Sequence, residues 1–363
     1  MKKVLALIFA LVLLVGCTTT GDNGDGNGDG SGNGDETIRV ALLVGFLGDM
    51  SFNDSAARGV NQAAQDFDNV DVNIIEFGDV ADRYEPTLLD AADSGYDIIM
   101  VATTLQEYVE THAADFPDTT FVIFDTEVDF SQGGLDNVYA ILYKANEASF
   151  LGGYVAAATS ETGVIGFLGG TDQPIISDFL VGYIQGAQLA NPDVKVATGY
   201  VGNWTDSARG KELSFAMYDQ GASMIFNVAG GGGVGLIEAG AERDRLVLGV
   251  DSDQAMIYKE AGNEAFASVI ASSVLKNVDY SLYRAIELYR DGTLAIGTTD
   301  VLGIKEGGVG LADNEYYQAL VDQEIRDFVA ELEEQVTNGE IVVDTAYGKS
   351  SDEINQLRES VRP

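Results

Sequence analysis

The side chains that could do chemistry in this chain follow the ends of predicted strands. They comprise carboxylates, an amide, two aromatic rings and a run of glycines: Asp49, Phe52, Asn53, Asp125, Trp204, Gly230–Gly233 and Asp251. In an open parallel sheet the carboxyl ends of the strands meet at one edge, and ligands bind there. Oxygen acceptors beside flat rings suit a polar ligand with a planar part, and glycines let a ligand approach main-chain N–H groups closely. The sequence therefore predicts a binding site for a small, polar, partly planar solute.

Each of these residues also has a purely structural interpretation. Asp54 or Ser51 could cap the helix that follows them. Phe52 and Trp204 could pack in a core, and a lone aspartate after a strand often closes a turn. The joint occurrence of these residue types at one predicted edge favours a binding site over the separate explanations.

The elements that must position these residues form two series of alternating strands and helices. Strands are predicted at 38–44, 72–77, 97–102, 121–124 and 138–143, and again at 164–168, 194–201, 224–228, 246–250 and 267–270. Helices are predicted between most strands, including 54–67, and in the late segments 274–290 and 315–338. Because the order is β-α-β, the sheets should be parallel and covered on both faces. We therefore predict an α/β fold with two doubly wound lobes and a hinged cleft.

The two series also begin alike. Gly45-Phe46-Leu47-Gly48 opens the first series and Gly166-Phe167-Leu168-Gly169 opens the second. Each leads through a polar loop into a helix with a later glycine, which is Gly59 in the first series and Gly182 and Gly186 in the second. This repetition predicts two similarly built lobes. We expect residues 37–143 with about 270–303 in the N-terminal lobe, and 144–269 with about 304–363 in the C-terminal lobe.

Composition limits the functional classes that are open to the chain. It has 58 acidic and 20 basic side chains, a net charge of −38, so it should repel nucleic acid and anionic lipid. One histidine, His112, and one cysteine argue against His/Cys zinc sites and Cys-His nucleophilic pairs, and no Gly-x-Ser-x-Gly turn accompanies His112. We predict no metal, no cofactor and no catalysis. A hydrolase with Asp125 and Asp251 as paired carboxylates is a distant alternative.

The amino terminus has the pattern of a lipoprotein signal peptide. Lys2 and Lys3 precede an apolar stretch, 4–16, too short to span a bilayer of about 30 Å, and the only cysteine, Cys17, follows directly. We expect residues 1–16 to be removed and Cys17 to carry lipid at the extracytoplasmic face of the cell membrane. The alternative is a buried free thiol beside an uncleaved anchor.

The segment 17–36 is rich in Gly, Asp, Asn and Ser, and it predicts a flexible linker of roughly 25 Å. Within it, Asp25-x-Asn27-x-Asp29-Gly30 followed by Glu36 matches a calcium-loop pattern. The pattern normally needs flanking helices, and low-complexity sequence produces such matches freely. We therefore favour a linker over a calcium site.

A second motif match is Gly230-x-Gly232-x-x-Gly235 with Asp251 about twenty residues on, which is the spacing of the dinucleotide fingerprint. That fingerprint normally opens the first βαβ unit of a domain, whereas here it lies late in the second series. We therefore favour glycines that bring main-chain N–H groups close to a ligand.

Four stretches of the chain resemble the signatures of the basic membrane protein family, in order between Ile38 and Lys276. They are residues 48–54, 226–235, 249–254 and 273–277. Members of this family are lipoproteins, similar to purine nucleoside receptors, with the two-lobed fold of type I periplasmic binding proteins. They deliver nucleosides to ABC importers. The resemblance implies a nucleoside ligand and an ABC transporter permease as partner. We expect the protein to be a monomer.

The resemblance also implies roles on the base side of the site. Phe52 matches one aromatic residue of a base-stacking pair, and Trp204 takes the place of the other. Asn53 lies in the same motif as Phe52, and Asp49 precedes them. Asp125 matches the carboxylate that reads the purine edge.

On the sugar side, the resemblance assigns Asp251 and Lys276 to the pair that holds the ribose hydroxyls, with Gly230 supplying backbone. We place Lys276 near the start of a helix. Where the purine receptors carry a further Asp before their Ser-Phe-Asn, this chain has Val44-Gly45-Phe46. Relatives bind riboflavin and other solutes, so riboflavin, a sugar or a signalling ligand is the alternative to a purine nucleoside.

Overall fold

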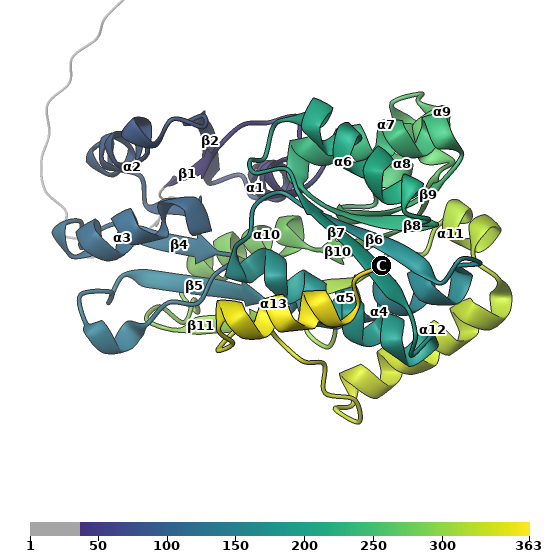
Figure 1. Ribbon diagram of the computed structural model, residues 1–363. Helices are drawn as coiled ribbons and strands as arrows, with labels where there is room; N and C mark the ends of the chain where they lie inside the picture. The colour runs from purple at the N-terminus through teal and green to yellow at the C-terminus, as the bar shows by residue number, and fades with distance from the viewer. Residues whose placement is uncertain (1–36) are drawn as a thin grey trace, which may run out of the picture. The chain divides into compact units, whose positions relative to one another are not determined.

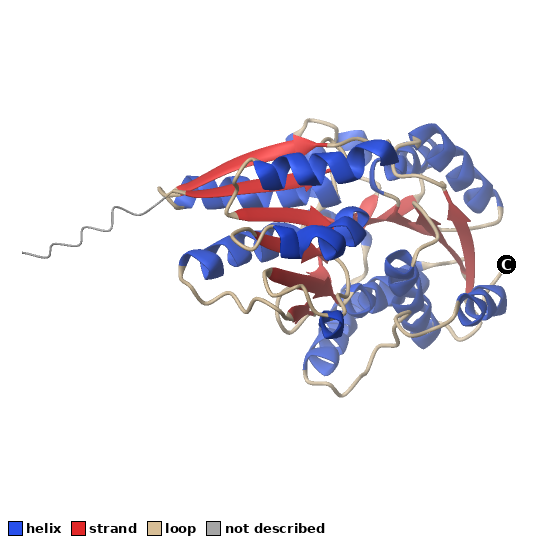
Figure 2. Ribbon diagram, turned by 90° about the vertical axis from the view of Figure 1, so that its left-hand side faces the viewer, coloured by secondary structure: helices blue, strands red, loops and turns tan. Residues whose placement is uncertain are grey.

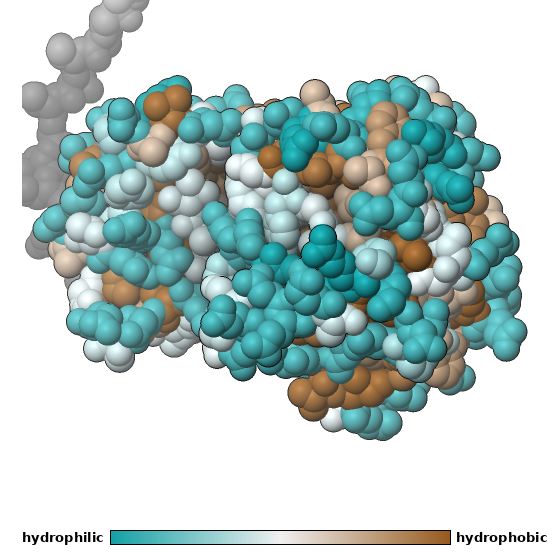
Figure 3. Space-filling model, in the orientation of Figure 1, coloured by the Kyte–Doolittle hydropathy of each residue, from teal (hydrophilic) through white to brown (hydrophobic). Residues whose placement is uncertain are grey.

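The computed structural model describes residues 37–363, which form two six-stranded sheets (Figure 1). Four predictions lie outside the described residues: the signal peptide 1–16, the lipid on Cys17, the linker 17–36 and its calcium-loop pattern. Within 37–363, no helix combines the length and the apolar character needed to cross a membrane. The face drawn in Figure 3 is mainly hydrophilic, in keeping with the excess of acidic residues.

The first sheet is built from the N-terminal series and one late strand. Its strands are β1 (Ile38–Val44), β2 (Val70–Glu76), β3 (Ile98–Ala102), β4 (Thr120–Phe124), β5 (Val138–Tyr143) and β11 (Thr299–Leu302). They are all parallel, in the order β11-β5-β4-β3-β1-β2. The helices beside this sheet are α1 (Phe52–Asp66), α2 (Tyr84–Asp93), α3 (Gln106–His112) and α10 (Val278–Arg290), and Figure 2 shows helices in front of and behind its strands.

Burial on both faces explains why the first strand is a continuous apolar run. Val40 and Leu42 belong to a core cluster with residues of α1 and α10, whereas Ala41 and Leu43 belong to a cluster with residues of α2 and α3. Successive side chains of a strand point to opposite faces, so a strand covered on both faces needs apolar residues at every position.

The second sheet repeats this arrangement. Its strands are β6 (Val164–Gly169), β7 (Lys195–Tyr200), β8 (Met224–Val228), β9 (Leu246–Asp251), β10 (Ile270–Lys276) and β12 (Val309–Leu311). The order is β12-β10-β9-β8-β6-β7, and β12 alone among these is antiparallel to its neighbour. The helices that accompany it are α4 (Ala145–Thr159), α5 (Pro174–Ala190), α6 (Ser207–Asp219), α7 (Val234–Arg243), α8 (Gln254–Glu260), α9 (Glu264–Ala267), α11 (Glu315–Leu320), α12 (Gln323–Thr337) and α13 (Ser351–Ser360).

Most predicted strands lie within two residues of the observed ones, but the last of the second series was wrong. The strand expected at 267–270 is β10, Ile270–Lys276, and Ala267 instead ends α9. The helix expected from 274 begins only at Val278. Since β10 belongs to the second sheet, the chain returns to the first sheet after Lys276 rather than at about 270.

Two further elements differ from expectation. The helix predicted over 315–338 is split into α11 and α12 because Val321 adopts an extended backbone and is buried. Strands β11 and β12 and helix α13 were not predicted from the sequence. Each is short or lies at the end of the chain, where the hydrophobic pattern is weak.

The repeated Gly-Phe-Leu-Gly phrase does not occupy equivalent places, whereas the later glycines do. Residues 45–48 follow β1, but residues 166–169 lie inside β6. A Cβ on Gly59 would lie 2.2 Å from the carbonyl oxygen of Asp279, and one on Gly186 would lie 1.8 Å from that of Phe150. These glycines therefore let α1 pack closely on α10, and α5 on α4.

Candidate ligand-binding site

One cavity of about 780 Å³ is lined by residues from the edges of both sheets. The structure brings all eight predicted ligand-binding residues to it: Asp49, Phe52, Asn53, Asp125, Trp204, Gly230, Asp251 and Lys276. Its volume lies within the range of about 300–1,000 Å³ that is usual for small-molecule sites. The placement of these residues thus follows the rule that ligands gather at the carboxyl ends of parallel strands.

Asp125 and Asp251 occupy equivalent positions in the two sheets. Asp125 directly follows β4 and Asp251 ends β9, and each of these strands is third in its sheet. Both aspartates have left-handed backbone, with φ of 70° and 61°, and both are buried. This conformation is disfavoured for residues other than glycine, so surrounding structure must hold it, as often happens at functional sites.

The partner of Asp125 is Lys276. The ammonium Nζ of Lys276 lies 2.8 Å from both carboxylate oxygens of Asp125, and both side chains are almost fully buried. The same ammonium lies 4.5 Å from the centroid of the Phe179 ring and 5.5 Å from that of Phe52. Lys276 was expected near a helix start and beside Asp251; it instead ends β10 and pairs with Asp125.

Asp251 has a different environment. Its carboxylate accepts a hydrogen bond from the hydroxyl of Ser51, and no ion pair joins it to another residue of 37–363. Burial raises the pKa of Asp251 to about 6, although the Lys276 charge and the Ser51 hydroxyl oppose the shift. An ionised carboxylate has about four acceptor positions, so Asp251 keeps capacity for further donors.

Asp49 serves the local fold more than the cavity. Its side chain accepts hydrogen bonds from the backbone N–H groups of Ser51, Asn53 and Asp54, at 3.0, 2.9 and 3.1 Å. Burial raises its pKa, and these hydrogen bonds act against that shift. The first turn of α1 is therefore capped by Asp49, whereas Ser51 and Asp54 were the caps considered from sequence.

Those two residues have other roles in the loop before α1. The side chain of Asp54 accepts hydrogen bonds from Gly48 N and Met50 N, both at 2.8 Å. Ser51 instead donates its hydroxyl to the carboxylate of Asp251. The loop before α1 is thus fixed by two carboxylates and one hydroxyl.

The two candidate stacking residues come from opposite halves and are both half-buried. Phe52 opens α1, and its ring centroid lies 5.5 Å from that of Phe124. Trp204 follows β7 and packs on bare backbone, since a Cβ on Gly170 would lie 2.4 Å from its ring. A Cβ on Gly230 would lie 3.6 Å from the same ring. Each ring therefore has one part in protein and another part at the cavity.

The glycines at 230–235 are needed mainly for close packing. Gly230, with a φ of 53°, is the member that lines the cavity. A Cβ on Gly233 would lie 1.8 Å from the side-chain oxygen of Asn227, and one on Gly235 would lie 1.8 Å from Ser207 O. Gly232 N donates to Trp204 O at 2.9 Å. Close packing and support of Trp204 thus account for the match to a dinucleotide fingerprint.

Sequence reasoning missed several lining residues. Phe179 lies in the second turn of α5, well beyond the end of the predicted strand 164–168, so the rule for strand ends did not reach it. Phe46 also lines the cavity, and a Cβ on Gly231 would lie 3.4 Å from its ring, so it reaches the other half. Tyr347 comes from the C-terminal segment, and no motif or periodicity marks it.

Within residues 37–363, no group of three or more His, Cys, Asp or Glu side chains is placed to hold a metal ion. The carboxylates of the cavity are instead engaged with Lys276, Ser51 and the backbone of α1. The arrangement can accept hydrogen bonds from a solute and cover its flat part with rings.

Comparison with known proteins places this geometry in context. Residues 38–346 match the family described as ABC transporter substrate-binding protein, PnrA-like. Basic membrane protein A of Borreliella burgdorferi is 30% identical over 354 residues, which cover 94% of this chain and 96% of that protein. A Lactococcus lactis protein named ABC transporter nucleoside-binding protein BmpA is 29% identical, and the match covers 94% of this chain and 99% of that protein.

Solved structures give the same picture of the fold. An ABC transporter solute-binding protein from Aeropyrum pernix has a TM-score of 0.79 at 28% identity, covering 89% of this chain and 97% of that one. GanP, a glucose-galactose binding protein from Geobacillus stearothermophilus, has a TM-score of 0.53 at 15% identity, covering 76% of this chain and 97% of that one. The second likeness concerns the fold alone.

Proposed function

The chain belongs to the PnrA-like family of ABC transporter substrate-binding proteins, and we propose that the solute it binds is a nucleoside, with a purine base favoured. Membership in this family makes it a solute-binding protein rather than an enzyme, with a solute and an ABC permease as its partners. The α/β fold with two mainly parallel sheets agrees with solute-binding proteins of known structure.

The observation that carries the proposal is the unequal environment of the two equivalent aspartates. Asp251 has free acceptor positions and a single hydroxyl partner, which suits the two adjacent hydroxyls of a ribose. Asp125 is already neutralised by Lys276 and can accept N–H groups from the edge of a base without leaving a buried charge uncompensated. One cavity thus offers a sugar side and a base side.

The aromatic residues support the same assignment. Phe52 and Trp204 reach the cavity from opposite halves, so a flat base between them would contact a ring on either side. Stacking of a base on an aromatic ring is worth about 1–3 kcal/mol and is largely independent of which base is present. The name of the Lactococcus relative, nucleoside-binding protein, also favours this solute class.

We further propose that the two sheets with their helices are lobes that close on the solute, and that the protein acts as a monomer. Residues 1–16 would be a signal peptide, and lipid on Cys17 would hold the protein at the extracytoplasmic face of the membrane. Relatives named basic membrane proteins support a membrane-associated location. Replacing Cys17 by Ala should remove the lipid mass and the detergent partitioning of the mature protein.

Native mass spectrometry of the full-length protein would test the solute class. We expect the protein to retain a purine nucleoside from the cells in which it is made, or to acquire inosine, guanosine or adenosine when they are added. A retained flavin or sugar, together with no adduct for any nucleoside, would replace this proposal with the alternative ligand class.

A further inference from the structure

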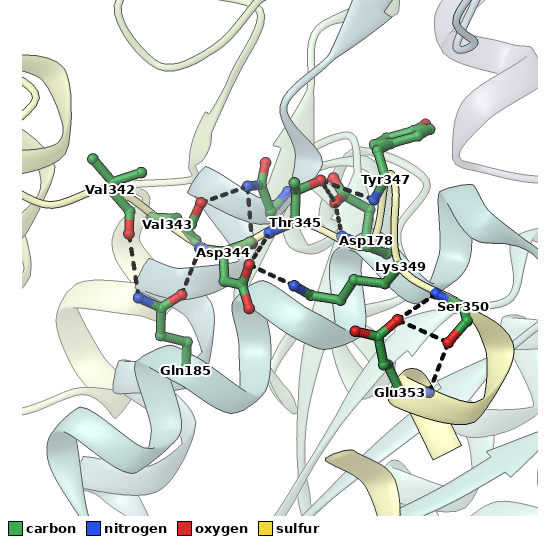
Figure 4. Close-up of polar contacts among 12 residues, drawn as sticks. Asp178, Gln185, Val342, Val343, Asp344, Thr345, Tyr347, Lys349, Ser350 and Glu353 are labelled. Carbon is green, nitrogen blue, oxygen red and sulfur yellow. Dashed lines mark hydrogen bonds and ion pairs between the residues drawn. The ribbon is translucent and has the colours of Figure 1, made fainter. Parts of the chain in front are cut away.

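The C-terminal segment 342–349, here called the strap, connects α12 to α13 and crosses α5 (Figure 4). It begins at Val342, which is 82% exposed. It ends at Ser350, whose hydroxyl forms a capping box with Glu353 at the start of α13. The strap is therefore a defined stretch between two helices rather than a loose tail.

Buried side chains of α4 and α5 hold the strap. The carboxylate of Asp178 accepts hydrogen bonds from the hydroxyl of Thr345 at 2.5 Å and from Ala346 N at 2.9 Å. Its other oxygen accepts from Asn146 N at 3.2 Å. A neighbouring strand would normally hydrogen-bond such a backbone segment. Here a buried carboxylate that accepts from three donors takes that role and holds the strap.

Two amide side chains complete this support. The side chain of Asn146 donates to the carbonyl oxygens of Val343 and Asp344, at 3.2 and 3.0 Å. Gln185 accepts a hydrogen bond from Asp344 N at 2.7 Å. Figure 4 shows Gln185 below Asp344, and Asp178 beside Thr345. The backbone between Val343 and Ala346 is thus satisfied by residues far away in sequence.

Helix α13 then fastens the strap from its other end. Arg358 forms a two-pronged ion pair with Asp172, with contacts of 2.8 and 3.0 Å. Asp172 directly precedes Gln173, which lines the solute cavity. Val196 N donates to Val361 O at 2.7 Å, so the end of the chain is also tied to the second sheet.

Tyr347 is the strap residue that lines the solute cavity. It lines the solute cavity and also a second cavity of about 580 Å³ formed beside β5, α4 and the strap. Glu127 lines both as well, so the two residues lie between the cavities. Burial raises the pKa of the Tyr347 phenol, and the charges of Asp125, Asp178 and Glu127 add to the shift. Because Tyr347 lines both cavities together with Glu127, which is two residues from Asp125, it lies on the Asp125 side of the solute cavity.

We propose that Tyr347 is a specificity-determining residue whose ring closes the base side of the solute cavity and limits the size of the base. Asp178 is the positioning residue that holds it there. The inference rests on the proposed function, because it places the edge of the base near Asp125 and Tyr347. Loss of the ring would join the solute cavity to the second cavity and admit a base with a bulky substituent.

Calorimetry with adenosine and N6-benzyladenosine would test this in four full-length proteins: wild type, Tyr347→Ala, Tyr347→Phe and Lys349→Met. A substituent forced against a well-packed wall should weaken binding to wild type by about 5- to 150-fold relative to adenosine. Tyr347→Ala should bring the two affinities close to each other, whereas Tyr347→Phe, which keeps the ring, should preserve the wild-type ratio. Lys349→Met is the matched control, since Lys349 belongs to the strap but pairs with exposed Asp344.

The role of Asp178 needs a readout that a general loss of stability would not change. Asp178→Ala should lower the ratio between the two nucleosides, and Asp178→Asn, which keeps an acceptor oxygen, should restore it. An equal loss of affinity for both nucleosides in Asp178→Ala, with the ratio unchanged, would reduce Asp178 to a structural role and overturn that part.

The outcomes separate the two claims. If wild type binds adenosine but Tyr347→Ala discriminates as strongly as wild type, the wall is elsewhere and only this inference is overturned. If wild type binds neither nucleoside, the nucleoside assignment fails, and the inference that depends on it fails too.

Discussion

Each half of the molecule carries an aspartate at the equivalent position, but the two carboxylates have different partners. Asp125 and Asp251 both stand at the end of the third strand of their sheet, with the same left-handed backbone. Asp125 is paired through both oxygens with Lys276, whereas Asp251 receives one hydroxyl, from Ser51. The two sheets thus place an aspartate at the equivalent position, and the neighbouring side chains give each carboxylate a different partner.

The difference depends on the strand next to each aspartate. In the first sheet β5 ends at Tyr143, and in the second β10 ends at Lys276 in the equivalent position. Lys276 pairs with the aspartate of the other half, and Ser51 likewise reaches from the first half to Asp251. Each aspartate is therefore satisfied by a side chain from the opposite half, so both contacts depend on how the halves are placed around the solute.

The largest expected effect is on stability when the buried ion pair is broken. Asp125→Asn leaves the buried ammonium of Lys276 without its ion-pair partner, and removal of one partner of such a pair costs about 3–5 kcal/mol. Urea unfolding at pH 7 would measure the loss. Asp344→Asn, which breaks the exposed pair with Lys349, is the control and should cost less than about 1 kcal/mol. A similar small loss for both variants would show that the buried pair has no special importance.

The same substitution at the equivalent position should act in the opposite direction. Asp251 binds its proton more tightly in the folded protein, where its pKa is about 6, than in the unfolded chain. Its contribution to stability is therefore full below about pH 4 and is lost as the pH rises through 6. Asp251→Asn removes this loss, so at pH 7 the ligand-free variant should be more stable by up to about 3 kcal/mol.

Urea unfolding of the Asp251→Asn variant and wild type at several pH values would check the sign of the stability difference and the pH range over which it develops. The gain should be small near pH 4 and should grow up to about pH 7. A variant that is less stable than wild type at pH 7 would contradict the assignment of Asp251 as a carboxylate held at a cost for binding.

A smaller effect should distinguish the two stacking residues. Trp204→Ala should weaken purine nucleoside binding by about 1–3 kcal/mol and lower stability less than Phe52→Ala does, because its ring rests largely on glycine backbone. Phe52→Ala should weaken binding and also lower stability, because Phe52 packs on Phe124 inside the first half. Titration calorimetry and thermal unfolding of both variants would compare them. If Phe52→Ala left the unfolding temperature unchanged, the packing of Phe52 on Phe124 would not distinguish it from Trp204.

The sequence predicted the parallel strands well because strands buried on both faces are nearly continuous apolar runs, as in β1 and β8. It misplaced β10, whose middle is Ala271-Ser272-Ser273, since small polar residues give a weak strand signal. These serines are fully buried and hydrogen-bonded: Ser272 Oγ donates to Ala312 O at 2.7 Å, and Ser273 Oγ accepts from Gln254 N at 3.2 Å. Tertiary contacts therefore extend this strand beyond its local propensity.

The candidate site was predictable as a set of residues but not as a set of pairs. The rule for strand ends located Asp125 and Asp251, because it depends only on the order of elements. The partner of Asp125 is 151 residues away, and the contact between Ser51 and Asp251 spans 200 residues. Such pairings follow from how the two sheets are placed, which local patterns do not encode. For the same reason the sequence alone did not predict Tyr347 as a lining residue of the cavity.

The central claim is that Asp251 holds the sugar and Asp125 the base, and calorimetry with three solutes tests it most directly. The solutes are inosine, 2′,3′-dideoxyinosine, which lacks both hydroxyls, and hypoxanthine, which lacks the sugar. Hydrogen bonds to a charged group are worth about 1.5–3 kcal/mol, so Asp251→Ala should weaken inosine binding by roughly 10- to 150-fold. It should leave the weaker binding of dideoxyinosine and hypoxanthine nearly unchanged. Equal losses for all three solutes, or no saturable binding of inosine to wild type, would contradict the account.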